Sequence, residues 1–310
     1  MYESHFNLQG NPFRSTTEPE LIYESVELRD ALAHFSYALE NGEAFVLLTG
    51  EVGSGKTTAV LAFQEKLSSD VPVATVNYAT LNPRELLQEV AIRFGVPVKS
   101  RDTKPHILAR LEGFLKKQKA ETGETALLVF DEAQLLKPAV LEEVRLLSNL
   151  ELNGSRLLHV FLVGQPELDH RLRTPELRPL RQRISLRYEL KPLGLEETRR
   201  YLTHRLVAVG RPRASEFFAA GAVEALRYLS HGLPREINVF AAQSMLNAYL
   251  EGSDHIETEH VQSAQSAFGF EGVADATRTD PVTARPHGTP AAIKPATEPK
   301  ASRRAAAKNL

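Results

Sequence analysis

Residues 50–57 read Gly-Glu-Val-Gly-Ser-Gly-Lys-Thr and match the pattern G-x-x-x-x-G-K-[ST] at every fixed position. An apolar run, residues 45–49, comes directly before this stretch, and a helical pattern follows it. A glycine-rich loop between a buried strand and a helix turns backbone N–H groups towards phosphate oxygens, and the helix N-terminus adds a partial positive charge. We therefore predict an ATP-binding phosphate loop formed by Gly50, Gly53, Ser54, Gly55, Lys56, Thr57 and Thr58.

Four side chains are expected to contact the phosphates, the metal or the attacking water. Lys56 should reach the β- and γ-phosphates, and the Thr57 hydroxyl should ligate Mg²⁺. A second apolar run, residues 127–130, ends in Asp131 and Glu132. Asp131 is expected to hold the Mg²⁺, directly or through water, and Glu132 to orient and deprotonate the attacking water. Two adjacent acids are common by chance, and the pair alone is a weak signal. Its place at the C-terminal end of a strand, where ligands bind in open α/β sheets, supports this interpretation.

The first two thirds of the chain alternate between short apolar runs and helical patterns. Strands are expected at residues 45–49, 73–77, 127–130, 157–163 and 184–190. Helices are expected at residues 26–39, after residue 56, and at 83–94 (with Asn82 as N-cap), 104–119 and 139–150. Strands separated by helices predict a doubly wound α/β fold, with a parallel five-stranded sheet flanked by helices.

After Pro192 the pattern changes to helices alone, expected at residues 195–209, 221–230, 233–250 and 258–268. We therefore predict four parts: an N-terminal arm (1–25), an α/β ATPase domain (26–191), a small all-helical lid domain (192–271) and a tail (272–310). The tail is rich in proline and lacks aromatic residues, so we expect it to be disordered. Its basic end is either solvated or in contact with nucleic acid or lipid headgroups.

The bulk composition excludes several kinds of protein. Cysteine is absent, so no disulfide or catalytic thiolate can exist. The formal net charge of −2 gives no global basic field of the kind found in nucleic-acid binders. The N-terminus does not resemble a signal peptide, and no apolar run approaches the ~20 residues that span a bilayer. We expect a cytoplasmic protein without an integral membrane segment, which could be peripheral at the inner membrane through a partner.

The acidic pair at residues 131–132, followed by a helical domain, resembles the AAA+ ATPases. This resemblance implies two sensor residues that touch the nucleotide. Gln165 ends the fourth expected strand, where AAA+ proteins keep the first sensor, and Arg235 stands where the second reaches back from the lid. The alternatives are a strand-end loop residue for Gln165 and a surface arginine for Arg235. Asn77, at the end of the second expected strand, could restrain Glu132 until a partner binds.

Residues 171–213 are rich in arginine, at positions 171, 173, 178, 181, 183, 187, 199, 200, 205, 211 and 213. The AAA+ resemblance implies that an arginine after the first sensor is an arginine finger, which completes the active site of a neighbouring subunit. Arg183 is the first candidate, followed by Arg181 and then Arg178. The other interpretations are a solvated face with helix-surface ion pairs, covering more than half of these arginines, and a DNA-facing role for some.

Further motifs narrow the resemblance. The sequence contains Phe6-Asn-Leu, Asn11-Pro-Phe13, Leu21-Ile-Tyr23, Gly164-Gln-Pro-Glu-Leu168 and Leu180-Arg-Gln-Arg-Ile184. Together these motifs, within residues 1–270, resemble the ExeA type (general secretion pathway protein A type) of AAA+ ATPases. The resemblance implies that Asn11 and Phe13 lie near the adenine of ATP. The alternative is that Phe6 and Phe13 only anchor the arm on the core.

Secretion members of this type continue into a transmembrane helix and a peptidoglycan-binding region, and this sequence shows neither. Two functions are therefore expected for a homo-oligomer, either a hexamer or a filament. The first is an ATPase motor or switch that serves secretion, pilus or envelope assembly proteins. The alternative is a DNA-binding ATPase regulator of transposition, with duplex DNA and a transposase as partners. A nucleotide-binding scaffold without turnover is a third hypothesis, and the intact Lys56, Thr57, Asp131 and Glu132 argue against it.

Overall fold

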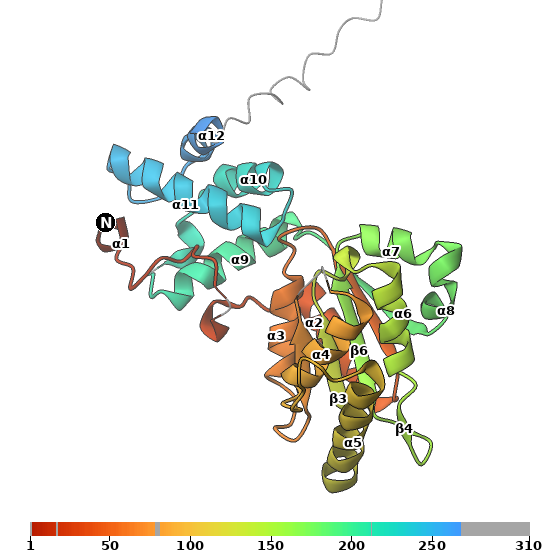
Figure 1. The fold of residues 1–310 in the computed structure, drawn as a ribbon. Coiled ribbons are helices and arrows are strands. Elements are labelled where there is room, and N and C mark those ends of the chain that lie inside the picture. The colour runs from red at the N-terminus through yellow and green to blue at the C-terminus, as the bar shows by residue number, and fades with distance from the viewer. Residues whose placement is uncertain (1, 17, 78–80, 212, 268–310) are drawn as a thin grey trace, which may run out of the picture. The chain divides into compact units, whose positions relative to one another are not determined.

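The computed structural model describes residues 2–16, 18–77, 81–211 and 213–267 (Figure 1). Its α/β core is built on five parallel strands: β1 (Phe45–Gly50), β2 (Val73–Val76), β3 (Ala126–Phe130), β6 (Leu158–Gly164) and β7 (Ile184–Leu190). Their order across the sheet is β2-β3-β6-β1-β7. Strand β6 thus lies between β1, which leads into the phosphate loop, and β3, which leads into the acidic pair. The predicted five-stranded parallel sheet is confirmed.

Helices cover both faces of this sheet (Figure 1). One face packs against α4 (Pro83–Arg93), α5 (Lys104–Thr122) and α6 (Pro138–Leu147). The other packs against α2 (Val26–Glu40) and α3 (Lys56–Gln64). Alternate strand residues point to opposite faces, so Leu47 of β1 joins the first cluster and Val46 joins the second. Burial on both faces explains why the three central strands β3, β6 and β1 are largely apolar runs in the sequence.

Two helix starts show the local rules that position these elements. The Ser25 hydroxyl accepts a hydrogen bond from Leu28 N at 3.1 Å and caps α2. The predicted N-cap at Asn82 is confirmed, and Asn82 also forms a capping box with Glu85. In that box the Asn82 side chain accepts from Glu85 N at 3.0 Å, and the Glu85 carboxylate accepts from Asn82 N at 2.8 Å.

The all-helical lid contains α9 (Leu195–Ala208), α10 (Ala220–Leu229), α11 (Pro234–Glu251) and α12 (Thr258–Ala267). The N-terminal arm, with α1 (Tyr2–His5) and the short helix η1 (Pro19–Leu21), shares its hydrophobic core. In Figure 1, α1 lies against α11 although most of the chain separates them in sequence. The arm and the lid therefore pack as one hydrophobic unit.

Aromatic residues and one buried arginine hold the arm in place. Phe6 packs edge-on against Phe217 with ring centroids 5.1 Å apart, and Phe13 packs against Phe218 at 5.9 Å. The buried Arg205 guanidinium of α9 donates to the backbone carbonyls of Pro12 (2.5 Å), Arg14 (2.6 Å) and Leu21 (3.2 Å). These three bonds give a buried charge the partners it needs and fix the path of the arm.

Some elements were not predicted. A hairpin of β4 (Glu151–Leu152) and β5 (Ser155–Arg156) precedes β6, and α7 (Glu167–Leu172) and α8 (Arg178–Arg181) connect β6 to β7. The hairpin turn is Asn153-Gly154, with φ of 53° and 79°. Asn-Gly is the strongest short signal for such a turn, so the sequence contained this information.

The remaining short elements are η2 (Ala133–Leu135), η3 (Pro175–Leu177) and η4 (Ala214–Glu216). Within the described ranges, the helices are too short or too polar to cross a lipid bilayer. The predicted tail, residues 272–310, lies outside the described residues.

Candidate nucleotide-binding site

The phosphate loop, residues 50–57, runs from the end of β1 to the start of α3. Gly53 and Gly55 have φ of 81° and 101°, a region that favours glycine. Gly50 is required for a different reason, because a Cβ there would lie 2.7 Å from Ser54 Oγ and 3.0 Å from the Leu190 carbonyl. The loop therefore turns tightly beneath the end of β7 and presents the N-terminus of α3 to the space above it.

Lys56 points into the phosphate loop. Its side chain is buried, and Nζ donates to the carbonyl oxygens of Gly50 and Glu51, both at 2.9 Å. Burial lowers the pKa of Lys56, while nearby carboxylates act in the opposite direction, Glu132 most strongly and then Asp131. A phosphate in this loop would meet a cation that has little access to water.

Thr57 and Asp131 meet across the site. The Thr57 hydroxyl donates to Asp131 Oδ2 at 2.8 Å, and Asp131 Oδ1 accepts from Glu132 N at 2.9 Å. The contact forms because α3 begins at the end of β1 while Asp131 follows β3, two strands away at the same edge of the sheet. A hydroxyl and a carboxylate are hard oxygen donors, so this pair fits Mg²⁺.

Glu132 is held by two glutamines. Its backbone is left-handed, with φ of 53°, and its Oε2 accepts from Gln134 Nε2 at 2.5 Å and from Gln165 Nε2 at 3.4 Å. Gln165 reaches Glu132 because β6 is the direct neighbour of β3. Asn77, which the sequence suggested as the restraint on Glu132, makes no hydrogen bond with it. Gln134 was missed, and its only sequence signal is its position two residues after Glu132.

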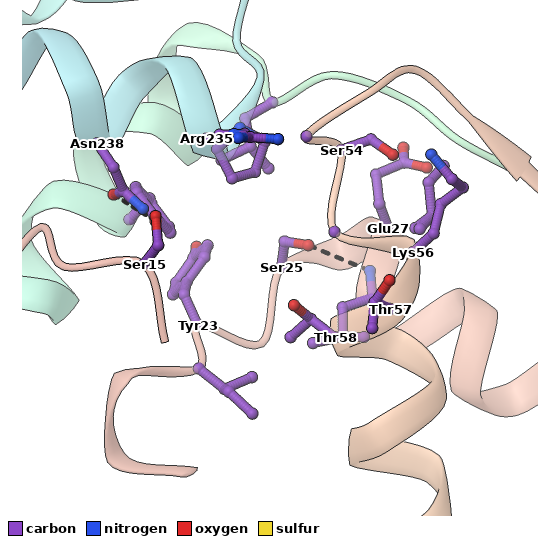
Figure 2. Close-up of a pocket in the computed structure, with 18 of the residues that line it drawn as sticks. Ser15, Tyr23, Ser25, Glu27, Ser54, Lys56, Thr57, Thr58, Arg235 and Asn238 are labelled. Carbon is purple, nitrogen blue, oxygen red and sulfur yellow. Dashed lines mark hydrogen bonds between the residues drawn. The ribbon is translucent and has the colours of Figure 1, made fainter. Parts of the chain in front are cut away.

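A cavity of about 650 Å³ opens beside the phosphate loop (Figure 2). Ser54, Thr58 and Glu132 line it from the α/β core, and the arm and lid complete its wall. Figure 2 shows Lys56 on one side of this space and Tyr23 and Asn238 on the other. The end at the phosphate loop is thus charged and rich in backbone N–H groups. The end at the arm and lid combines the aromatic Tyr23 with the polar Asn238, and these two ends suit the phosphates and the base of a nucleotide.

The arm and lid side of the cavity is rigidly built. The Tyr23 hydroxyl donates to Glu197 of α9 at 3.2 Å, and burial together with that carboxylate raises the pKa of Tyr23 to about 12. The Tyr201 hydroxyl donates to Asn238 Oδ1 at 2.7 Å, so the Asn238 amide nitrogen stays available as a donor. Apart from the Leu21-Ile-Tyr23 motif, sequence reasoning missed these residues, because single polar residues inside helices form no pattern.

Arg235 stands at the first turn of α11, directly against the phosphate loop. Its backbone N–H donates to the Gly53 carbonyl at 3.3 Å, and a Cβ on Gly53 would lie 2.7 Å from Arg235 Cβ. In Figure 2 its side chain lies beside Ser54. Gly232 makes this approach possible, because with φ of 77° it comes so close to Leu193 that a Cβ would lie 2.2 Å from the Leu193 carbonyl.

Asn11 and Phe13 are not among the residues that line the cavity, and their expected place near the adenine stays a prediction. The Asn11 side chain accepts from Phe13 N at 2.8 Å, and the Phe13 ring is buried against Phe218 in the lid core. The arm residues that do line the cavity come later in the chain: Ser15, Thr16, Leu21, Ile22, Tyr23 and Ser25. The Phe13 ring lies in the lid core because an aromatic ring gains more from full burial there than from a half-open cavity wall.

Most of the arginines in residues 171–213 have partners. Eight make side-chain hydrogen bonds or ion pairs: Arg171, Arg173, Arg183, Arg187, Arg199, Arg200, Arg205 and Arg211. Arg183 donates to Ser148 Oγ at 3.2 Å and to the Asn149 side chain, so it is engaged within its own chain. Arg178 and Arg181 are exposed, and neither guanidinium bonds to any residue in the described part of the chain.

Comparisons with known proteins agree with this architecture. Residues 39–172 match the family described as AAA domain. The chain is 36% identical over 284 residues to general secretion pathway protein A of Aeromonas hydrophila. The aligned region covers 89% of this chain and 49% of that protein. The chain therefore spans about half the length of this relative.

Two solved structures share the fold. The Aeropyrum pernix ORC2 protein, in its ADPNP–ADP complexes, has a TM-score of 0.60 at 19% identity, covering 85% of this chain and 72% of that chain. Cdc6p from Pyrobaculum aerophilum has a TM-score of 0.64 at 19% identity, covering 83% and 70%. The chain therefore contains a region, residues 39–172, that matches an AAA domain, and it is similar to general secretion pathway protein A over most of its own length.

Proposed function

We propose that this protein binds ATP in the cavity beside the phosphate loop and hydrolyses it to ADP and phosphate. The observation that carries the proposal is the 2.8 Å hydrogen bond from Thr57 to Asp131, with Glu132 next in the chain. This contact brings the predicted metal-binding and water-activating residues to the phosphate loop. Thr57 and Asp131 would hold Mg²⁺, which when bound neutralises charge on the phosphates.

The chain's own residues divide the remaining work. The phosphate loop and Lys56 bind and orient the phosphates, because their N–H groups and charge converge on one space. Glu132 accepts the proton of the attacking water, and Gln165 contacts the same carboxylate. Arg235, beside the phosphate loop at the start of α11, would sense the nucleotide from the lid. Loss of the terminal phosphate would then change the contacts of Arg235, and the lid and the arm would respond together because they share one hydrophobic core.

We further propose that the active site is completed by an arginine from a second copy of this chain, in a homo-oligomer. Arg178 and Arg181 are favoured because they are exposed and their guanidinium groups have no partner among the described residues, whereas Arg183 is held by Ser148 and Asn149. An unpaired guanidinium is free to meet a neighbour's phosphates without first breaking a bond. Arg183 remains a candidate for the arginine finger only if assembly of the oligomer breaks its bonds to Ser148 and Asn149.

For the cellular role, we propose a motor or switch in secretion, pilus or envelope assembly, held at the cytoplasmic side of the inner membrane by a partner. The support is the similarity to a protein named for the general secretion pathway. The second candidate is a DNA-bound regulator of transposition. The exposed Arg178 and Arg181 favour it, since free guanidinium groups suit DNA phosphates, but eight of the eleven arginines are already engaged.

The central test is phosphate release from ATP with Mg²⁺ by the wild type and by Glu132→Gln. We expect Glu132→Gln to bind ATP normally and to lose about 10²-fold or more in turnover, as expected for loss of a general base. Glu121→Gln, an exposed glutamate of α5, is the matched control and should hydrolyse ATP like the wild type. No phosphate release by the wild type would overturn the proposed hydrolysis, and equal turnover in Glu132→Gln and wild type would overturn the proposed role of Glu132.

The same assay with and without duplex DNA separates the two cellular roles. The secretion role predicts unchanged turnover and no gel shift of DNA at low salt, where phosphate contacts are strongest. Strong stimulation by duplex DNA would replace it with the transposition role.

A further inference from the structure

The Gln134 side-chain amide makes hydrogen bonds through both its nitrogen and its oxygen, next to the candidate catalytic carboxylate of Glu132. Its Nε2 donates to Glu132 Oε2 at 2.5 Å, and its Oε1 accepts from Gln165 N at 3.1 Å. The Gln165 side chain donates to the same Glu132 oxygen at 3.4 Å. Gln134 is therefore a bridge between the loop after β3, which carries Glu132, and the end of β6.

The surroundings of Gln134 are shaped to hold this bridge. A Cβ on Gly164 would lie 2.6 Å from Gln134 Oε1 and 3.2 Å from Gln134 N, so the missing side chain at Gly164 leaves room for the amide. The Arg171 guanidinium of α7 donates to the backbone carbonyls of Gln134 and of Leu136, the latter at 2.6 Å. The backbone of η2 and the amide are thus fixed independently.

The hydrogen-bond pattern distinguishes the two oxygens of Glu132. Both glutamine amides donate to Oε2, and Oε1 has no hydrogen bond from any residue in the described ranges. A carboxylate in a left-handed turn at a loop, without these bonds, would rotate among several rotamers. The two amide donors instead fix its orientation and leave Oε1 available to accept a proton.

We propose that Gln134 is a positioning residue for ATP hydrolysis, which holds Glu132 through Oε2 so that Oε1 faces the attacking water. This inference rests on the proposed function, because it assigns a role only if Glu132 is the general base. A displaced general base can lower a rate by about 10²-fold even when the substrate is bound normally. Gln134 acts through Glu132 and is not among the residues that line the cavity.

The test compares Gln134→Ala and Gln134→Glu with the wild type, after the wild type has been shown to hydrolyse ATP and Glu132→Gln to have lost turnover. Glutamate at 134 has the same length and can still accept from Gln165 N, but an ionised carboxylate cannot donate to Glu132. We expect both variants to lose about 10- to 100-fold in kcat, with KM and the Kd for a fluorescent ATP analogue within about twofold of wild type. Gln118→Ala is the matched control, because Gln118 lies on α5, where its amide donates to the Asp70 carbonyl. Its kcat should equal that of the wild type.

A double-mutant cycle separates positioning from a general structural role. In the Glu132→Gln background, Gln134→Ala should lower the residual kcat by less than about twofold, because there is no general base left to position. Unchanged kcat in Gln134→Glu, an equal loss in both backgrounds, or a loss of ATP affinity matching the loss of rate would each overturn this proposal. A wild type that hydrolyses no ATP, or a fully active Glu132→Gln, would instead overturn the proposed function.

Discussion

At the scale of the residue, Lys56 shows how much of the site depends on one side chain. Its ammonium group lies inside the phosphate loop, 2.9 Å from the carbonyl oxygens of Gly50 and Glu51. Charge-assisted hydrogen bonds contribute about 1.5–3 kcal/mol each, so loss of two such bonds to phosphate should cost more than a factor of about 100 in affinity. We predict that Lys56→Ala lowers ATP affinity at least that much, measured by titration with a fluorescent ATP analogue.

Lys66→Ala is the matched control for this prediction. Lys66 lies just beyond the C-terminal end of α3, is exposed, and pairs with Glu24 at 3.4 Å. Surface pairs of this kind contribute little, so the control should bind ATP like the wild type. If both variants bound ATP equally, Lys56 would have no special role in holding phosphate.

At the scale of the element, the start of α11 depends on one glycine. Gly232 has a positive φ and lies against the Leu193 carbonyl, and Leu193 N donates to the Gly232 carbonyl at 2.8 Å. This close approach places Arg235 at the phosphate loop. We predict that Gly232→Ala lowers the free energy of unfolding by about 1–2 kcal/mol from the positive φ and by about 1–3 kcal/mol more from the clash, and that it weakens ATP binding.

Gly252→Ala provides a control with the same backbone conformation. Gly252 ends α11 with φ of 74°, but a Cβ there meets no atom within 4 Å. Only the contribution of the positive φ should therefore appear in its denaturation curve, and ATP affinity should not change. Equal destabilisation by the two substitutions would mean that the contact with Leu193 does not position α11.

At the scale of the whole molecule, the prediction concerns catalysis across two copies of the chain. The Arg178→Ala/Arg181→Ala double variant should bind ATP but lose about 10³-fold in turnover, as expected for removal of an arginine finger. Mixing it with Glu132→Gln should restore activity, because one chain then supplies Glu132 and the other supplies the arginines. The measurement is ATPase activity of each variant alone and of their mixture.

Arg213→Ala serves as the control for the arginine variants. Arg213 belongs to the lid, and among the described residues its guanidinium, like those of Arg178 and Arg181, has no bonding partner. Its substitution should leave turnover unchanged. Failure of the mixture to regain activity, with both variants still binding ATP, would reject Arg178 and Arg181 and return Arg183 to consideration.

Across the whole molecule, the elements of the fold that could be predicted from sequence are those with a strong local pattern. The strands 45–50 and 184–190 and the capped helix at 83–93 were predicted within a residue or so, because buried strands and N-caps leave strong local patterns. The short helices α7 and α8 were not predicted, since each is only a few residues long and too short to show a helical period.

The sequence by itself determined that this protein carries a phosphate loop, an acidic pair at a strand end and a parallel sheet with a helical lid. Each of these depends on residues close together in the chain, so local pattern is sufficient. Only the tertiary structure decided that Gln134 holds Glu132 and that Phe13 belongs to the lid core. It also decided that, within the described ranges, Arg183 has bonding partners while the guanidinium groups of Arg178 and Arg181 have none. These depend on which strands become neighbours and which side chains meet across the fold, and a linear pattern contains no such distances.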